Sequence, residues 1–306
     1  MGDPEVSAGG SRESVAYLAT AGGLVVMEPS GSVVGQEHDG RAVVAVASHG
    51  DNLAVALAED GVLRREGDGW ASLGLAGAHV WTIALGAGGD VYAGTEPAAL
   101  WLLGASGPRE LLGLRAVEGY DKWDSPWGAA DLPTIVVDGS RIIVGIEVGG
   151  AAVSYDGGDT WEARNAGLYD DVHRIVADGK TLYATTGMGC HRSGDEGRSW
   201  VFESDGLDRA YTQGLAFTKG AVLATASSGP PPMWESGGRR RRSSEPTPVT
   251  TICAGPSWRR ASQATSSARR SPRRATSWSR ARLRERSSSA AMPATRSSWR
   301  RRACRR

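Results

Sequence analysis

Short runs of apolar residues recur along the first 238 residues, and Gly, Asp, Asn or Ser bounds each run. The clearest runs are DNLAVAL, GDVYAGT, SRIIVGI, KTLYATT and GAVLATA, at Leu53, Val91, Ile142, Leu182 and Val222. Short segments rich in β-branched residues between such turns are typical of antiparallel strands. No amphipathic helical pattern separates the runs, which excludes long parallel α/β alternation.

These runs form an internal repeat. Counted from a weaker first copy at Val15, successive spacings are 38, 38, 51, 40 and 40 residues. Another β-rich run precedes each clear copy, as in AVVAVAS and VWTIALG, and a third follows several of them. A period of roughly 40 residues with several strands per unit is that of a β-propeller blade. The pattern therefore predicts an all-β propeller with four-stranded blades, of which six are legible and a seventh is expected in an intact relative.

The interval of 51 residues contains an aromatic and charged insertion, EGYDKWDSPWG, at residues 118–128. Loops of this size on a repeat scaffold often carry function. Tyr120, Trp123 and Trp127 are therefore candidate ligand contacts. The alternative is that the loop only covers one end of the central channel.

Two segments one repeat apart share a motif. Residues 154–161 read SYDGGDTW and residues 193–200 read SGDEGRSW, and both fit S-x-D-x-G-x-[ST]-W. The chain therefore resembles the BNR, or Asp-box, β-propellers found among sialidase-like proteins, sortilin-type receptors and photosystem II assembly factors. The resemblance covers residues 15 to about 238, and GDGW at residues 67–70 is a candidate degenerate third copy.

The physics of this motif is structural. An aspartate accepts hydrogen bonds from backbone N–H groups in a tight turn, and a glycine permits a positive φ. A Ser or Thr hydroxyl adds hydrogen bonds, and the tryptophan buries a large ring between neighbouring blades. We assign this role to Ser154, Asp156, Gly158, Thr160, Trp161, Ser193, Asp195, Gly197, Ser199 and Trp200. The resemblance implies that the turn joins the two outer strands, away from the binding face.

The resemblance to propellers also indicates where a ligand would bind, at the channel mouth where each innermost strand begins. The blades align on Ile83, Ile135, Ile175 and Leu215. Two positions earlier lie Trp81, Pro133, His173 and Gln213. Four positions earlier lie His79, Asp131, Asp171 and Tyr211. Equivalent positions of a repeat converge on one rim, so we predict that these residues form one concave site with the aromatic residues of the insertion. The alternative is ordinary packing at the rim.

These features favour a non-enzymatic binding or assembly scaffold whose partner is a protein, a polar small molecule or a glycan. The alternative is a sialidase-like or other glycan-active hydrolase, which the resemblance allows. Such an enzyme is expected to have three arginines that clamp a carboxylate, a Tyr–Glu pair and an acid Asp. The Arg-Ile-Pro motif expected near the first blade is absent, and Arg12 and Arg41 lack its context. A glycosidase also needs a carboxylate pair, which so acidic a chain can supply by chance.

No sequence pattern points to a metal or a cofactor. The five histidines show no close ligand spacing, and the Gly-rich turns lack the strand–loop–helix context of a nucleotide site. Cys190 is interpreted as a packed thiol. We therefore predict neither a metal nor a cofactor.

Charge divides the chain at about residue 238. Residues 1–238 carry 15 Lys and Arg against 32 Asp and Glu, whereas residues 239–306 carry 20 Arg, no Lys, no Asp and two Glu. The second segment has too few aliphatic residues to build a core, so we predict a disordered tail. A basic arm that contacts nucleic acid is a third functional hypothesis, disfavoured because the tail has arginine without lysine and isolated tryptophans.

An out-of-frame translation of the last blade also explains this tail. In a G/C-rich back-translation shifted by two nucleotides, residues 273–281 read AGDVVVAG, which is close to GDVYAG at residues 89–94. That frame would supply the seventh blade.

The expected location is the cytoplasm, without a membrane partner. No apolar run approaches the roughly 18 residues of a membrane span. The first residues lack the basic and apolar regions of a signal peptide. Of three cysteines, one precedes residue 239, which suits a reducing compartment rather than a disulfide framework.

Overall fold

The computed structural model describes residues 15–126, 128–204, 207, 209–218, 221–227 and 229–230, together with strands β22 (Ile252–Cys253) and β23 (Arg259–Arg260). The predictions for the tail therefore fall, apart from these two strands, outside the described residues. Within these described residues, regular structure is β except for two 3-10 helices, η1 (Leu112–Ala116) and η2 (Tyr120–Lys122). The all-β prediction is confirmed. No helix in the described part of the chain has the length and apolar character to cross a membrane.

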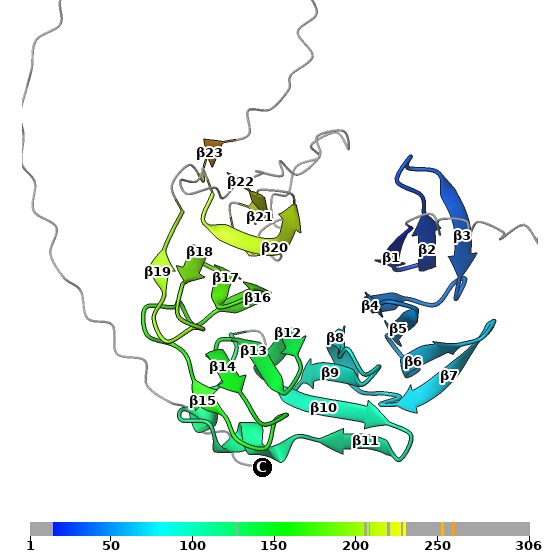
Figure 1. Cartoon of the computed structure of the whole chain (residues 1–306), viewed down its shortest axis with the longest axis horizontal. Coiled ribbons are helices and arrows are strands. Elements are labelled where there is room, and N and C mark those ends of the chain that lie inside the picture. The colour runs from blue at the N-terminus through cyan, green and yellow to red at the C-terminus, as the bar shows by residue number, and fades with distance from the viewer. Residues whose placement is uncertain are drawn as a thin grey trace, which may run out of the picture. The chain divides into compact units, whose positions relative to one another are not determined.

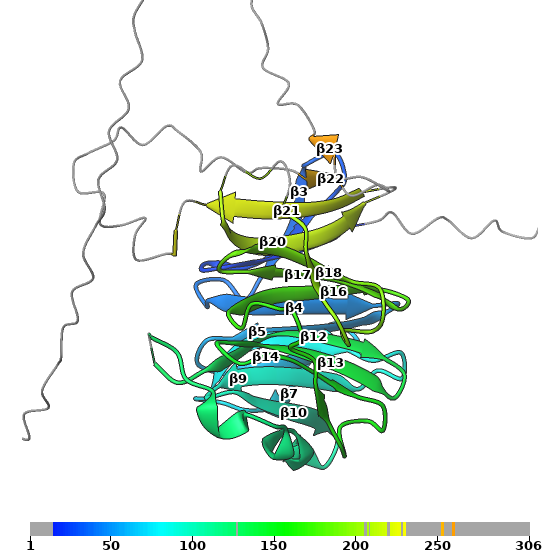
Figure 2. The same ribbon diagram turned by 90° about the vertical axis from the view of Figure 1, so that its left-hand side faces the viewer.

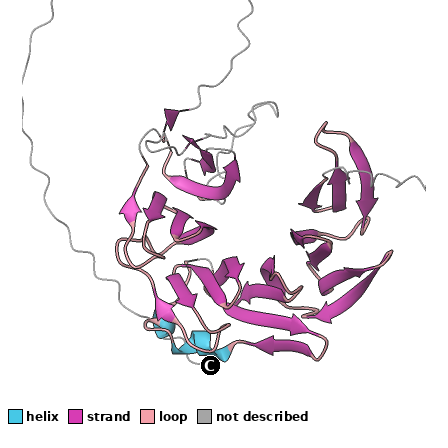
Figure 3. Cartoon of the chain, in the orientation of Figure 1, coloured by secondary structure: helices cyan, strands magenta, loops and turns pink. Residues whose placement is uncertain are grey.

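The strands form antiparallel sheets that follow the chain order (Figures 1 and 3). The first sheet consists of β1 (Ala16–Thr20), β2 (Gly23–Met27) and β3 (Val33–Glu37). Sheets of four strands follow. The second sheet consists of β4 (Val43–His49), β5 (Asn52–Leu57), β6 (Gly61–Glu66) and β7 (Gly69–Gly74), and the third of β8 (His79–Leu85), β9 (Val91–Glu96), β10 (Ala99–Gly104) and β11 (Gly107–Glu110). The fourth sheet consists of β12 (Asp131–Asp138), β13 (Arg141–Glu147), β14 (Gly150–Ser154) and β15 (Glu162–Ala163). The fifth consists of β16 (Val172–Asp178), β17 (Thr181–Thr186), β18 (Gly189–Ser193) and β19 (Val201–Phe202). The next sheet pairs β20 (Tyr211–Thr218) with β21 (Ala221–Ser227).

The sheets are arranged as the blades of a propeller. The innermost strands β4, β8, β12, β16 and β20 contact one another in succession. In Figure 1 the sheets therefore follow an arc, and in the perpendicular view their strands lie in successive layers (Figure 2). Radially repeated four-stranded antiparallel sheets define a β-propeller. The sequence repeat of about 40 residues corresponds to one sheet, with the clear copies at β5, β9, β13, β17 and β21.

A buried apolar cluster lies at each contact between neighbouring sheets. Between the fourth and fifth sheets, for example, Ile143 and Val153 pack with Val172, Ile175 and Trp200. Comparable clusters join the first sheet to the second, the second to the third, the third to the fourth and the fifth to the sixth. Each sheet is thus stabilised mainly by its neighbours, as in other repeat proteins.

Close approach between blades requires glycine at one position of the repeat. A Cβ atom on Gly94 in β9 would lie 2.4 Å from the carbonyl oxygen of Leu132, and one on Gly145 in β13 would lie 2.7 Å from Cγ1 of Val172. Both neighbours belong to the innermost strand of the next sheet. The glycine in the GTE and GIE segments therefore lets the next innermost strand pack directly on the second strand.

The first sheet starts at the second strand of the repeat. At the turn after β1, the Thr20 hydroxyl accepts a hydrogen bond from the amide of Gly22 and donates one to the carbonyl of Gly23. The Thr186 hydroxyl makes the same two bonds, with Met188 and Gly189, at the turn between the second and third strands of the fifth sheet. β1 also contacts β4 as β5 contacts β8. Among the described residues, no strand pairs with the inner edge of β1.

Candidate functional site

Hairpin register brings polar residues together at the end of the sheets where the innermost strands begin. In the third sheet His79 pairs with Glu96, and in the fourth Asp131 pairs with Glu147. Glu147 also forms an isolated bridge with Asp171, just before β16. Each of the five innermost strands has a register shift near this end. Such a shift changes the direction in which the first side chains of the strand point. We call this end the rim.

A cavity of about 320 Å³ opens at the rim. The residues that line it come from four sheets: Trp81, Pro133, Glu147, His173, Arg174, Gln213, Gly214 and Leu215. All four residues predicted two positions before the aligned apolar residues are among them. The structure thus brings Trp81, Pro133, His173 and Gln213 to one concave surface, and their role in binding stays a prediction.

The four residues predicted four positions before the aligned apolar residues, His79, Asp131, Asp171 and Tyr211, lie around the same rim. The rings of His173 and Tyr211 contact each other at a tilt, with centroids 4.6 Å apart, and those of His79 and Trp81 do so with centroids 4.9 Å apart. Glu96 holds the latter pair, because its Oε2 lies 2.8 Å from His79 Nδ1 and accepts a hydrogen bond of 3.3 Å from the Trp81 indole. Trp81 remains 42% exposed, so it presents an aromatic surface to solvent beside the cavity.

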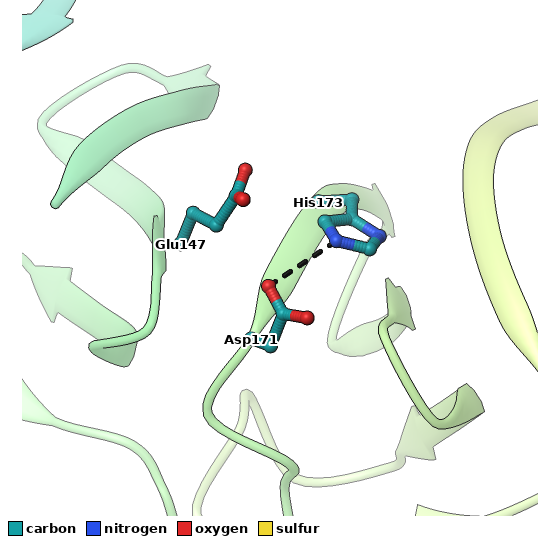
Figure 4. A group of neighbouring side chains, drawn as sticks. All are labelled: Glu147, Asp171 and His173. Carbon is teal, nitrogen blue, oxygen red and sulfur yellow. Dashed lines mark ion pairs between the residues drawn. The ribbon is translucent and has the colours of Figure 1, made fainter. Parts of the chain in front are cut away.

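Three side chains at the rim form a compact group of carboxylate and imidazole. Asp171 Oδ1 lies 3.2 Å from His173 Nε2, and Figure 4 shows the carboxylate of Glu147 across from this pair. One ligand atom from each of the three residues lies within 4.8 Å of the other two. On the other side of the imidazole, His173 Nδ1 bonds the carbonyl oxygen of Thr212 in β20. We call Glu147, Asp171 and His173 the rim cluster.

Burial and mutual repulsion shift the ionisation of the rim carboxylates. Burial raises the pKa of Asp131 to about 7, and the negative charges of Glu147 and Glu96 add to this effect. Burial likewise raises the pKa of Glu147, with a further contribution from Asp171. Desolvation at Tyr211 also raises the pKa of its hydroxyl. Carboxylates are thus crowded here without enough positive charge to balance them.

His173 has the opposite balance. Burial lowers the pKa of its imidazole, but Asp171, the Thr212 carbonyl and the charge of Glu147 outweigh burial and raise the pKa above its ordinary value. The geometry therefore favours a positive charge between these groups.

The insertion lies mostly outside this cavity. The rings of Tyr120 and Trp123 contact each other at a tilt, with centroids 4.8 Å apart, and Trp123 packs against the buried cluster between the third and fourth sheets. Neither residue lines the cavity at the rim. Trp127 lies outside the described residues, whereas Gly128 is close to the rim, since a Cβ atom there would lie 3.0 Å from Glu96 Oε1.

The two Asp-box turns have the predicted hydrogen bonds. Asp156 accepts from the Ser154 hydroxyl at 2.8 Å and from the amide and hydroxyl of Thr160 at 2.9 and 2.6 Å. The Thr160 bonds lower the pKa of Asp156 to about 2. The serine hydroxyl also accepts from the amide of Gly158 at 2.9 Å, where φ is 99°. The residues that follow the aspartate are thus held by its own side chain.

The second turn repeats this network. Asp195 accepts from Ser193 at 2.7 Å and from the amide and hydroxyl of Ser199 at 2.9 and 2.7 Å. Those serine bonds lower the pKa of Asp195 to about 2, and Gly197 again has a positive φ of 83°. The two turns join the third and fourth strands of their sheets, at the positions that the resemblance implied.

The tryptophans of the two turns differ. Trp200 is 5% exposed and donates to the carbonyl of Arg164, which follows the preceding sheet. Trp161 is half-buried and donates to the carbonyl of Gly158 in its own turn. Trp200 therefore joins two sheets as predicted, through both its ring and its hydrogen bond. Trp161 also packs against the cluster between the third and fourth sheets, but its hydrogen bond is local.

The segment at residues 67–70 is a plain β-hairpin turn between β6 and β7. Its Trp70 donates to Glu37 of the first sheet at 2.9 Å and lies 4.7 Å from the Arg65 guanidinium. This tryptophan therefore also contacts the preceding sheet, although the turn has no serine in front of it.

Sequence reasoning did not select Glu96 and Glu147. Both end the second strand of their sheets, in the segments VYAGTE and RIIVGIE. The signal that could have selected them is a glutamate two residues after the repeat glycine. Antiparallel pairing places such a glutamate opposite the start of the innermost strand. The rim cluster combines the end of β13 with the start of β16 and contains a single histidine, which is why the spacing of histidines alone indicated no ligand set.

Comparisons with known proteins support the fold. No family model and no curated protein matches the chain. Among solved structures, the chain is similar to YCF48 from Cyanidioschyzon merolae, with a TM-score of 0.56, 15% identity and 82% of each chain covered. It is similar to YCF48 bound to D1 peptide, with a TM-score of 0.52, 14% identity, and 81% of this chain and 77% of that chain covered.

A third similar structure is the extracellular domain of the putative hybrid two component system BT4673 from B. thetaiotaomicron. It has a TM-score of 0.56 and 14% identity, and the match covers 70% of this chain and only 30% of that chain. The chain thus has a β-propeller fold, which it shares with YCF48.

Proposed function

We propose that this protein is a non-enzymatic binding scaffold that holds a segment of a partner protein at the rim cavity. The observation that carries the proposal is the cavity itself, because side chains from four successive sheets converge on it. An exposed indole, a proline, an amide and a guanidinium line one surface, supplied by Trp81, Pro133, Gln213 and Arg174. Aromatic and arginine side chains are the residue types that dominate protein interfaces.

A similar structure supports the choice of a peptide as ligand. YCF48, to which the chain is similar in fold, has been solved bound to D1 peptide. The size of the cavity here, about 320 Å³, fits one or two side chains of an extended segment rather than a folded domain. We therefore expect recognition of a short segment with neighbouring residues lying across the rim.

A glycoside hydrolase is the second candidate. Its support is the proximity of Glu147 and Asp171, whose ligand atoms lie within 4.8 Å of one another beside the cavity. The same hypothesis requires a cluster of arginines to clamp an anionic sugar, and Arg174 is the single arginine among the residues that line the described cavity. The binding scaffold therefore accounts better for the surface.

The test selects peptides from a random displayed library on the purified full-length chain and measures the affinity of the enriched peptides by fluorescence anisotropy. Replacing Trp81 by Ala should weaken binding about tenfold or more, because a large aromatic contact is lost. Phe202→Ala is the matched control, since Phe202 is 58% exposed on β19 and is not a residue of the cavity.

Failure to enrich any peptide family would contradict the proposal. Equal losses in Trp81→Ala and Phe202→Ala would contradict the assignment of the site to the rim. Cleavage of aryl glycosides that disappears in Glu147→Gln would instead support the hydrolase.

A further inference from the structure

We propose that Glu147, Asp171 and His173 bind a divalent transition-metal ion at the rim, with Asp131 as an additional carboxylate beside it. This inference goes beyond the binding of a protein segment and does not depend on it. It rests on the geometry of the rim cluster, on the orientation of one buried imidazole and on one buried carboxylate oxygen that has no partner.

The three side chains already stand close enough to share an ion. One ligand atom of each lies within 4.8 Å of the other two, and Figure 4 shows them converging from the end of β13, the segment before β16 and β16 itself. The backbones of Glu147 and Asp171 are paired by a bridge, so the spacing of the two carboxylates is set by the sheet arrangement. A modest contraction brings all three donors to coordination distances.

His173 is oriented as a metal ligand is. A carbonyl oxygen can only accept, so the Thr212 carbonyl requires the hydrogen on Nδ1 of His173. In the neutral ring this leaves the lone pair on Nε2, which points at Asp171 Oδ1 at 3.2 Å and has no hydrogen-bond partner in the described structure. Metal-bound histidines commonly donate their other N–H to a backbone carbonyl in this way.

A lone pair and a carboxylate oxygen repel each other at this distance unless a positive charge lies between them. A proton on Nε2 or a metal ion can supply that charge. The side chains of His173 and Asp171 are only 7% and 22% exposed, so bulk water screens the contact weakly. The arrangement therefore requires either a proton on Nε2 or a metal ion between the imidazole and the carboxylate.

Asp131 favours the metal ion over the proton. It is 6% exposed, and its Oδ1 has no hydrogen-bond partner among the described residues. Asp131, Glu147 and Asp171 interact electrostatically with one another around the single imidazole. One proton on His173 offsets one of these charges, whereas a divalent ion offsets two. A buried carboxylate oxygen without a hydrogen-bond partner is costly, and an adjacent cation lowers that cost.

The donor set indicates the class of metal. Carboxylates alone suit Mg²⁺ and Ca²⁺, whereas an imidazole together with carboxylates suits Zn²⁺, Mn²⁺ and related ions. Glu147 and His173 both line the cavity, so an ion held by them would have a coordination position facing it. A ligand entering the cavity would then be able to contact the ion directly.

The experiment measures metal binding by the full-length chain after removal of metals with a chelator. Calorimetric titration with Zn²⁺ and with Mn²⁺ is expected to give about one equivalent bound, with no comparable binding of Mg²⁺. Co²⁺ substitution is then expected to give the visible spectrum of nitrogen and oxygen ligation without a thiolate charge-transfer band, which separates this site from any cysteine site.

Glu147→Gln and Asp171→Asn should each weaken binding about tenfold or more, because each replaces a charged ligand by an amide of the same shape. Asp138→Asn is the matched control, since it removes one carboxylate from the other end of β12, where Asp138 pairs with Arg141. Added Zn²⁺ should raise the thermal midpoint of the wild type and of this control but not of the two ligand variants.

Two results would overturn the proposal. If the wild type binds no metal stoichiometrically, the pair of Asp171 and His173 holds a proton instead. If Glu147→Gln and Asp171→Asn bind as tightly as the control, the metal lies elsewhere in the chain. Peptide affinity measured with and without chelator keeps either outcome separate from the test of the proposed function.

Discussion

Aspartates recur at equivalent positions of the repeat in two regions, the turns between the outer strands and the rim. The surroundings of the aspartates differ between these two regions. Asp156 and Asp195 each accept three hydrogen bonds from their own turn, and those bonds lower the pKa of each to about 2. Asp131 is buried with one oxygen unpartnered, and burial raises its pKa to about 7.

This difference separates structure from function within one repeat. A carboxylate whose hydrogen bonds are all supplied by its own turn has little capacity left for a ligand. A carboxylate that is desolvated beside other carboxylates is unfavourable unless a proton, a metal ion or a bound group compensates it. We therefore expect changes at the outer turns to affect stability, and changes at the rim to affect binding and pH dependence.

The largest expected effect is on stability, at an outer turn. Trp200→Ala removes an indole that is 5% exposed and the hydrogen bond to Arg164, so the free energy of unfolding should fall by about 3–5 kcal/mol. Trp161→Ala should cost less, about 1–2 kcal/mol, because this ring is half-buried and bonds only its own turn. Denaturant titration measures both.

Equal losses in these two variants would contradict the distinction between the tryptophan that joins two sheets and the one whose hydrogen bond is local. A change in the peptide affinity of the folded Trp200→Ala protein would contradict the expectation that changes at the outer turns affect stability and not binding.

The next effect is a pH dependence of opposite sign in the two regions. The pKa of Asp131 is about 7 in the folded state against 3.8 for an ordinary aspartate, so between these pH values the folded state holds a proton that the unfolded state has released. Its contribution to stability is therefore present below about pH 4 and is lost as the pH rises towards 7. The pKa of Asp195 is about 2, so its contribution is present above about pH 4 and is lost as the pH falls towards 2.

Asp131→Asn should remove part of the decline between about pH 4 and 7 and make the protein more stable than the wild type at pH 8. Asp195→Asn should instead lower stability at neutral pH and flatten the acid limb. Thermal unfolding in the presence of chelator measures both curves, and chelation keeps any metal from masking the rim carboxylates. Parallel pH profiles for wild type and Asp131→Asn would show that the rim is not electrostatically strained.

The fold was largely predictable because its signals are local. Turn residues recur every repeat, and the serine, aspartate and glycine of the Asp-box form their hydrogen bonds within one turn. The start of each innermost strand was predictable too, because alignment on Ile83, Ile135, Ile175 and Leu215 places Trp81, Pro133, His173 and Gln213 at one position.

The chemistry at the rim was less predictable because it depends on pairing between strands. Glu96 and Glu147 reach the rim through hairpin register, and Glu147 meets Asp171 only because neighbouring sheets contact each other. Trp123 was predicted at the mouth from its composition and loop position, but it packs against a buried cluster between two sheets. Side-chain direction in an insertion has no repeat to reveal it.

The smallest effect tests whether outer turns are governed by backbone geometry alone. Glu196 takes in the second Asp-box the place of Gly157 in the first, and φ is positive at both, 62° and 75°. Its side chain contacts Arg141 of β13 at 3.4 Å and Tyr155, directly after β14, at 3.2 Å. Glu196→Ala and Glu196→Gly both remove these contacts, but only glycine relieves the backbone, so Glu196→Gly should be the more stable of the two by about 1 kcal/mol.

The matched pair is Arg198→Ala and Arg198→Gly, in the same turn but without a positive φ. There the order should reverse, since glycine only adds conformational entropy to the unfolded chain. Denaturant midpoints of the four variants decide the matter. If the alanine variant is the more stable at both positions, backbone conformation does not determine which residue the turn accepts. The outer turns would then differ less from the rim than the hydrogen bonds of their aspartates indicate.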